Sequence, residues 1–337
     1  MINGHGDDAY RYTAIHANFS SNVYHRVNHD GLNRYLAGCL PCIRSYPEPE
    51  PYALAAELAR LHGVSPEEVC VTNGATEAIY LIAQAFCGSH SAVWIPTFSE
   101  YADACRLHGH RVEGISSLEK LTGNEGIFWL CNPNNPTGQT WDAATLRRLI
   151  ATYPRKLFVI DQSYALFTEK KVLSVAETVK LPNVLLLHSM TKCYAVPGLR
   201  LGAVTGSREL LSRIRACRMP WSVNQLAIEA GLHLLEHDVP NPLDVASYLQ
   251  EAARLRSALE ALGGLEVWAT ETHFMLVCLR MGRASALKDY LAGEHGILIR
   301  DASNFDGLNE HFFRIAAQSR EENDRLVKAI GQWLEEE

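Results

Sequence analysis

The sequence lacks an apolar run long enough to span a membrane, which takes roughly 18 residues, so we expect no membrane protein. It also lacks a long run of Lys and Arg: its 31 basic residues are outnumbered by 38 acidic ones, and the net charge is -7. That balance argues against binding nucleic acid across the surface. The N-terminus has no basic stretch followed by an apolar one, as a secretory signal would, and we therefore expect a cytoplasmic protein.

The spacing of a disulfide scaffold is also absent. Nine cysteines are spread from Cys39 to Cys278, which favours reduced thiols. Cys39 and Cys42 have the C-x-x-C spacing of redox and zinc sites, but no second C-x-x-C accompanies them. We interpret them as two unpaired structural cysteines.

The sequence does have the composition of a folded protein, with 47% hydrophobic and 20% charged residues. Five short runs in the middle of the chain are continuously apolar, which is typical of strands buried on both faces. These runs are Ser91–Pro96, Gly126–Pro133, Leu157–Tyr164, Asn183–Met190 and Leu201–Gly206. Because helical patterns such as Thr76–Phe86 and Ala143–Tyr153 alternate with them, the sequence predicts an α/β domain with a mostly parallel sheet.

The last third of the chain has a different pattern. A helical pattern covers about Asn241–Leu262, and four strand-like segments follow it, with helices between and after them. The segments are Leu265–Thr270, His273–Leu279, Gly296–Asp301 and His311–Ala317. Residues 18–44 contain little regular signal. We therefore expect an N-terminal segment (1–45) that packs with the small domain, a large domain (46–230) and a small C-terminal α+β domain (231–337).

Two loops are candidates for ligand binding. Residues Thr72–Glu77 place small and capping side chains where a strand meets a helix. Free N–H groups and the helix dipole make such a helix start an anion site, although an ordinary capped helix looks the same. Residues Cys131–Gly138 follow a strand and offer asparagine amides between prolines, a composition that also describes a tight turn.

Two strand ends carry ionisable side chains. Asp161 ends a strand, at the edge where parallel sheets bind ligands, and Tyr164 follows closely; the alternative is an aspartate that caps the next turn. Lys192 follows another buried strand, where desolvation would lower its pKa and make the amine nucleophilic. Arg200, with hydroxyls nearby, could hold a phosphate dianion. A solvated surface lysine is the alternative, but it does not explain this cluster of residue types.

Together, a phosphate site, a carboxylate, a tyrosine, an amide and an activated lysine suggest pyridoxal 5′-phosphate. A lysine binds the aldehyde of this cofactor as a Schiff base, and a carboxylate keeps the ring nitrogen protonated. The order NGATEAI, PTFSEY, CNPNNPTG, IDQSY, SMTKCYAVPGLRLG and RIAAQSR resembles the fold-type I, aspartate aminotransferase-like enzymes along almost the whole chain. The resemblance implies a mostly parallel seven-stranded sheet flanked by helices, a smaller α+β domain, and pyridoxal 5′-phosphate as the cofactor.

The resemblance also assigns roles around the cofactor ring. Lys192 would form the Schiff base and carry the proton at Cα, while Asp161 would pair with the pyridine nitrogen. Asn135 and Tyr164 would hydrogen-bond the ring hydroxyl, and Phe98 would stack on the ring face. One departure from the family pattern is Gln162-Ser163, where Glu-Ala is common, but the flanking Asp161 and Tyr164 are retained.

At the cofactor phosphate, the resemblance implies a second group of residues. These are Gly74, Ala75, Thr76, Ser189 and Arg200. Tyr46 matches a tyrosine that reaches the phosphate from the neighbouring subunit, which implies a homodimer with shared active sites. Arg314 matches the arginine that binds the substrate carboxylate through a bidentate contact.

Two subgroups of the family fit best, the L-threonine-O-3-phosphate decarboxylases of cobalamin synthesis and the histidinol-phosphate aminotransferases. Several segments look more like the decarboxylases: His5-Gly6, Asn18–Val23, Met219–Asn224 and Gly296–Arg300. We therefore take four residues, with Arg314, as candidates for the shell that orients the substrate: His5, Asn18, Trp221 and Arg300. His5 could instead be a disordered terminal residue, and Trp221 could be core packing.

Orientation of the substrate decides the reaction, because the bond that stands perpendicular to the conjugated ring breaks most easily. Our leading hypothesis is a decarboxylase that acts on a phosphorylated, threonine-like amino acid. The alternative is an aminotransferase such as histidinol-phosphate aminotransferase. A remote alternative is a ligand-sensing transcription regulator of the same fold, but the N-terminus has no helix-turn-helix pattern.

Overall fold

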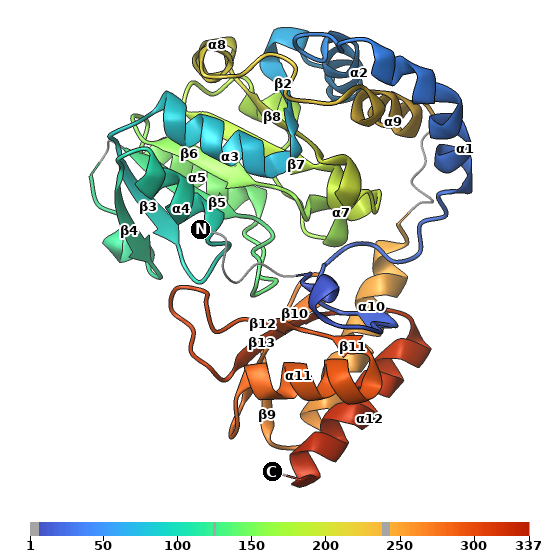
Figure 1. Cartoon of the computed structure of the whole chain (residues 1–337). Helices are drawn as coiled ribbons and strands as arrows, with labels where there is room; N and C mark the ends of the chain where they lie inside the picture. Colours follow the sequence, from blue (N-terminus) through green and yellow to red (C-terminus); the bar gives the residue numbers. More distant parts are fainter. Residues whose placement is uncertain (1–6, 124–125, 238–242, 337) are drawn as a thin grey trace.

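The larger part of the molecule is built on a seven-stranded sheet with the order β2-β8-β7-β6-β5-β3-β4 (Figure 1). The computed structural model describes residues 7–123, 126–237 and 243–336. Strand β8 runs antiparallel to both of its neighbours, and the other pairs are parallel. The strands are β2 (Val69–Asn73), β3 (His90–Trp94), β4 (Arg111–Ile115), β5 (Ile127–Cys131), β6 (Leu157–Asp161), β7 (Val184–Ser189) and β8 (Leu201–Gly206). The predicted α/β fold with a mostly parallel sheet is confirmed.

Helices cover both faces of this sheet, which is why its central strands are continuously apolar. Every residue of β5 and β6 is buried. One face packs against α5 (Ala143–Thr152) and α6 (Val175–Thr178). The other face packs against α3 (Gly74–Ala85), α4 (Glu100–Leu107) and α8 (Arg208–Ala216). Strands enclosed in this way show no alternation of polar and apolar side chains.

The smaller part is an antiparallel sheet with the order β12-β13-β10-β9. Its strands are β9 (Leu265–Val267), β10 (Phe274–Leu279), β12 (Arg300–Asp301) and β13 (Phe312–Ala316), and its helices are α10 (Val245–Glu260), α11 (Ala284–His295) and α12 (Arg320–Glu336). Helix α10 and strand β9 end earlier than the sequence pattern predicts. Near the N-terminus, β1 (Ala17–Asn18) pairs in parallel with β11 (Ile297–Leu298), so the first described residues lie beside this part (Figure 1).

Residues 30–44 differ from the expectation of little regular structure. They form α1 (Asp30–Cys39) and the 3-10 helix η2 (Leu40–Arg44), and α1 packs on α9 (Gln225–Glu236). Only Leu32 of α1 is fully buried, and the helix contains two glycines. Contacts with α9 therefore stabilise a segment whose own helical propensity is weak. Helix α2 (Tyr52–His62) follows and also packs on α9. The division into domains stays a prediction.

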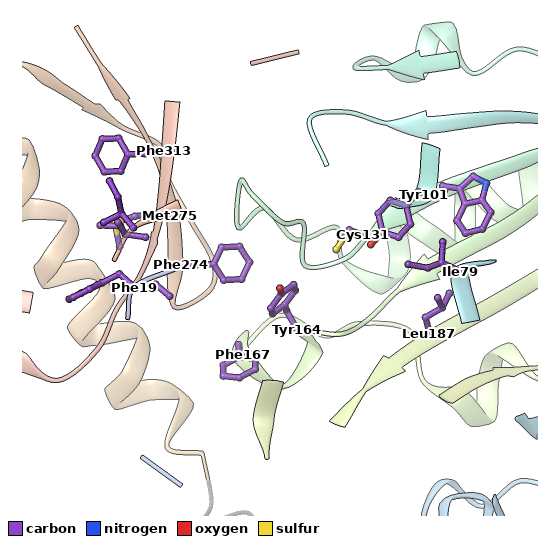
Figure 2. Close-up of a cluster of buried hydrophobic side chains, with 14 of the residues drawn as sticks. Phe19, Ile79, Tyr101, Cys131, Tyr164, Phe167, Leu187, Phe274, Met275 and Phe313 are labelled. Atoms are coloured by element: carbon purple, nitrogen blue, oxygen red, sulfur yellow. The ribbon is translucent and has the colours of Figure 1, made fainter. Parts of the chain in front are cut away.

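Buried side chains connect the two parts of the molecule. Figure 2 shows Tyr164 between Tyr101 and Cys131, from the large part, and Phe274, from the start of β10. The rings of Tyr164 and Phe274 meet edge to face, with centroids 4.8 Å apart. Tyr164 is therefore held from both sides at the junction. In the described part of the chain, no helix is long and apolar enough to cross a membrane.

Candidate functional site

A cavity of about 480 Å³ lies at this junction, against the carboxyl ends of β5, β6 and β7 and the first turn of α3. Ligands bind at this edge of open α/β sheets because the loops that follow parallel strands gather there. The structure brings eleven of the predicted site residues into the cavity lining: Ala75, Thr76, Phe98, Asn135, Asp161, Tyr164, Ser189, Lys192, Arg200, Arg300 and Arg314.

Lys192 lies in α7 (Met190–Cys193), directly after β7. Its Nζ donates a hydrogen bond to the backbone oxygen of Ser21, at 3.1 Å, and lies 5.9 Å from the centroid of the Tyr164 ring. Burial and the nearby Arg314 guanidinium lower the pKa of Lys192 to about 8. Because the lowered pKa gives far more neutral amine near neutral pH than an ordinary lysine has, Lys192 can act as a nucleophile and can exchange protons.

Asp161 is the last residue of β6, and its side chain is buried. One carboxylate oxygen accepts a hydrogen bond from the Tyr101 hydroxyl at 2.7 Å, and the other accepts from the Ser163 amide at 2.8 Å. These two donors fix the direction of the carboxylate within the cavity. A buried carboxylate held in this way can stabilise a cationic ring nitrogen.

Tyr164, Asn135 and Arg314 lie together on one side of the cavity. Arg314, on β13, donates to the side-chain oxygen of Asn135 and to the backbone oxygen of Ser20, whereas its Nε has no partner. Burial lowers the pKa of Arg314 to about 10 and raises the pKa of Tyr164 above its usual value. A buried guanidinium with an unpartnered N–H is suited to bind an anionic group of a ligand.

At the other end of the cavity, α3 and β8 approach each other closely. Gly74 has a φ of 76°, and a Cβ there would lie 2.4 Å from Nη2 of Arg200. A Cβ on Gly202 would lie 2.6 Å from the amide nitrogen of Ala75. The absence of side chains at these positions lets the N–H groups of the first turn of α3 and the Arg200 guanidinium face the same space. This arrangement is a cradle for a phosphate group.

Arg300 is a further buried cationic group that lines the cavity. It lies on β12, and its guanidinium donates to the backbone oxygen of Asp301 at 2.6 Å and to the side-chain oxygen of Asn304 at 2.7 Å. Its guanidinium carbon lies 5.2 Å from the centroid of the Phe305 ring. Burial lowers the pKa of Arg300 from its usual value.

Other predicted site residues lie outside the cavity lining. Gly74 lies next to the lining residue Ala75, and Asn18 donates to Asp7, a lining residue, at 2.6 Å. Tyr46 is 83% exposed, and its ring centroid lies 5.1 Å from that of Trp221. The two rings form an exposed aromatic pair on the surface. His5 lies outside the described residues.

Several residues of the site were missed by the sequence analysis. Tyr101 holds Asp161, the backbone of Ser20 and Ser21 accepts from Arg314 and Lys192, and Asn22 donates to the Tyr164 hydroxyl at 3.4 Å. Tyr101 stands close to Phe98 in the PTFSEY motif, a signal that could have identified it. The N-terminal residues reach the site only through the fold, because they are separated from their partners by 142 or more positions.

Neither cysteine of the C-x-x-C pair takes part in this site. Cys39 and Cys42 are free thiols at the end of α1 and in η2. Among the described residues, no group of three or more His, Cys, Asp or Glu side chains is arranged to hold a metal ion.

Comparison with known proteins gives relatives along nearly the whole chain. The chain is 30% identical over 328 residues to a threonine-phosphate decarboxylase of Salmonella typhimurium, which covers 93% of this chain and 89% of the relative. It is also 30% identical over 323 residues to a histidinol-phosphate aminotransferase of Desulfitobacterium hafniense, which covers 90% and 88%. The crystal structure of L-threonine-O-3-phosphate decarboxylase from Porphyromonas gingivalis is similar at a TM-score of 0.92 and 38% identity, covering 95% of this chain and 99% of that one.

The side chains of the cavity fit the predicted cofactor. The buried carboxylate of Asp161, the amine of Lys192 and the cradle at Gly74 can serve the ring nitrogen, the aldehyde and the phosphate of pyridoxal 5′-phosphate. The family model for class I and II aminotransferases matches residues 38–330. The protein therefore belongs to the class I and II aminotransferase family and is an enzyme with pyridoxal 5′-phosphate as its cofactor.

Proposed function

We propose that the enzyme decarboxylates a phosphorylated amino acid of the L-threonine O-3-phosphate type and releases an aminopropanol phosphate. The observation that carries this proposal is the pairing of Arg300 with Arg314 in the ladder between β12 and β13. Directly opposite residues point to the same face of a sheet, and like charges there are destabilising. Both arginines line the cavity, so two buried cations are kept side by side where a ligand would bind.

A substrate with two anionic groups explains this costly arrangement. Arg314, which lines the cavity, would bind the carboxylate of the substrate through its guanidinium group. Arg300 would bind the substrate phosphate, and Asn304 would hold the guanidinium in place. Similarity to the decarboxylases from Salmonella typhimurium and Porphyromonas gingivalis supports a phosphorylated amino acid as the substrate.

The positions of the lining residues support the roles that the family resemblance implies around the cofactor. When bound, pyridoxal 5′-phosphate withdraws electrons from the Cα of the substrate through its ring. Asp161 would hold a proton at the ring nitrogen, and Phe98 would cover one face of the ring. Asn135 and Tyr164 would hydrogen-bond the ring hydroxyl.

The phosphate of the cofactor would lie in the cradle formed by the first turn of α3 and β8. Gly74, Ala75 and Thr76 would supply backbone N–H groups, and Ser189 and Arg200 would supply side-chain donors.

The choice of reaction would depend on which bond at Cα the arginines turn out of the plane of the ring. With Arg314 and Arg300 holding the two ends of the substrate, the bond between Cα and the carboxylate would be turned out of plane. That bond would then break with its electron pair remaining at Cα, and the carboxylate would leave as CO2. Lys192 would deliver the proton that replaces CO2 at Cα, a task suited to an amine whose pKa lies at about 8.

The test is to supply L-threonine O-3-phosphate to the holoenzyme and to measure release of CO2, with L-threonine as the matched substrate without a phosphate. We expect CO2 from the phosphorylated substrate and little from L-threonine. The similarity to histidinol-phosphate aminotransferase supports a second candidate, amino transfer from histidinol phosphate to 2-oxoglutarate. Formation of glutamate without CO2 would overturn the decarboxylase in favour of that alternative.

We also propose a homodimer in which Tyr46 serves the cavity of the neighbouring chain. The exposed pair of Tyr46 and Trp221 supports this arrangement, since two large aromatic rings are rarely left together in solvent. His5 and Asn18 remain candidates for the substrate shell. Asn18 would act through Asp7, which it contacts.

A further inference from the structure

A carboxylate from the N-terminal segment lines the cavity beside Lys192. Asp7 lies in the same lining as Lys192, Arg300 and Arg314. Its Oδ1 accepts a hydrogen bond from Asn18 at 2.6 Å, and its backbone N–H donates to Ser20 Oγ at 3.1 Å. Among cationic groups suited to anionic ligands, a negative side chain needs an explanation of its own.

The backbone of Asp7 is held in a conformation that side-chain-bearing residues rarely adopt. Its φ is 64°, in the left-handed region that favours glycine. Such residues persist only where the surrounding contacts fix them, and they gather at functional sites. Asp7 itself contacts Asn18 and the buried Ser20, and its neighbour in the chain adds a further restraint.

The next residue supplies that restraint. Both carboxylate oxygens of Asp8 accept hydrogen bonds from Lys288 Nζ, at 2.8 and 2.6 Å. The two side chains are only 10% and 11% exposed, and Lys288 lies on α11 of the smaller part. One position further along this helix, Asp289 accepts a hydrogen bond from the Tyr12 hydroxyl at 2.9 Å. A buried ion pair of this kind adds little net stability but fixes geometry, and here it fixes the residue that follows Asp7.

Charges on several elements act on the amine of Lys192. The titratable groups that face it are Asp7, Asp161, Tyr164, Arg200, His273 and Arg314. Burial lowers the pKa of Lys192 most, and Arg314 and Arg200 lower it further. Asp7 and Asp161 act in the opposite direction. Asp161 is held by Tyr101 and Ser163, whereas the position of Asp7 depends on the contacts of the N-terminal segment.

We propose that Asp7 is a positioning residue that sets the protonation of the Lys192 amine, and that the Asp8–Lys288 ion pair holds Asp7 in place to do so. Lys288 therefore acts on Lys192 from α11. It does so through its ion pair with Asp8, which holds the neighbouring Asp7. The inference rests on the proposed role of Lys192 as the amine that binds the cofactor. Removal of the negative charge at Asp7 destabilises the protonated nitrogen, so the pH at which that nitrogen loses its proton falls.

The test is a pH titration of the visible absorbance of the holoenzyme, which follows the protonation of the nitrogen that Lys192 contributes. Asp7→Asn should lower the midpoint of this titration by roughly half a pH unit, since Asp7 is partly exposed and solvent screens its charge. Lys288→Met should lower the midpoint in the same direction, and Lys288→Arg should restore it. Asp306→Asn, an exposed carboxylate outside the cavity lining, is the matched control and should leave the midpoint unchanged.

The double variant decides whether the two residues act in one chain of contacts. If Lys288 acts through Asp7, then Asp7→Asn combined with Lys288→Met has the same midpoint as Asp7→Asn alone. A further shift in the double variant, or an unchanged midpoint in Asp7→Asn, overturns the inference. Should Lys288→Met fail to fold, Asp8→Asn removes the same ion pair and is read in the same way. If the unsubstituted holoenzyme had no visible absorbance band, the proposed role of Lys192 would be contradicted instead.

Discussion

The floor and the wall of the cavity are built in different ways. The floor comes from the carboxyl ends of β6 and β7, where Asp161 and Lys192 follow strands that are buried along most of their length. The wall comes from the N-terminal segment and the small sheet, where Asp7, Arg300 and Arg314 are held by contacts between distant parts of the chain. In our proposal, the floor carries the groups that act on the cofactor, and the wall carries two arginines that orient the substrate and one carboxylate, Asp7, that acts on Lys192.

The largest effect is expected on the floor. Lys192→Ala removes the amine that we propose binds the cofactor and moves the proton, so activity should fall by roughly a thousandfold or more. The visible absorbance of the covalently bound cofactor should disappear as well. Lys156→Met is the matched control, because Lys156 is also buried but does not line the cavity. A visible band that persists in Lys192→Ala would show that the cofactor has been assigned to the wrong lysine.

On the wall, Arg300→Met should act on substrate binding rather than on the cofactor. Loss of a charged hydrogen-bonding group should raise KM for L-threonine O-3-phosphate roughly tenfold to a hundredfold. Affinity for L-threonine, measured by the change in the visible spectrum, should stay the same. Arg280→Met, at an exposed position directly after β10, serves as the control. An equal loss for both ligands would mean that Arg300 does not bind the phosphate.

A smaller effect is expected at the subunit boundary. Tyr46→Ala should lower activity roughly fivefold, as for the loss of one hydrogen bond. When chains that carry Tyr46→Ala are mixed with chains that carry Lys192→Ala, activity should recover. In a mixed dimer, one cavity has an intact Lys192 and receives Tyr46 of the partner subunit. The mass of the mixed dimer verifies that the subunits have exchanged. If activity then does not recover, Tyr46 serves the cavity of its own chain or no cavity at all.

The last prediction concerns the stability of the fold in acid, with no effect on activity at neutral pH. His188, on the floor strand β7, and His273, at the junction, should behave alike. Burial lowers the pKa of His188 and of His273 to about 3, from 6.5. Below about pH 6.5 the unfolded chain takes up protons at these positions and the folded chain does not, so the free energy of unfolding decreases as the pH falls from about 6.5 toward 3. By pH 5 we expect a loss of about 2 kcal/mol per histidine, measured from urea midpoints. His188→Gln should make the free energy of unfolding less dependent on pH between about 6.5 and 3. The same dependence on pH in that variant would contradict the prediction.

The sequence predicted the floor better than the wall for a physical reason. Asp161 and Lys192 each follow a continuous apolar strand, and the carboxyl ends of parallel strands meet at one edge of a sheet, so local patterns are enough to bring them together. Asp7, Asn22 and Lys288 carry no local pattern of this kind. The pairing of Asp8 with Lys288 spans 280 positions and depends on how the chain ends are brought together. Helix α1 was also missed because contacts between distant parts of the chain form it: its packing on α9 outweighs its weak helical propensity.

The register between β12 and β13 has one further consequence. Arg300 and Arg314 are opposed by backbone hydrogen bonds, so the separation of the two cations is set by the ladder rather than by flexible side chains alone. A shift of one residue would turn one guanidinium to the other face and leave a single cation in the cavity. If both arginines bind the substrate as proposed, the small sheet would discriminate between substrates by length, because a molecule whose two anionic groups are too close together or too far apart could not engage both arginines at once.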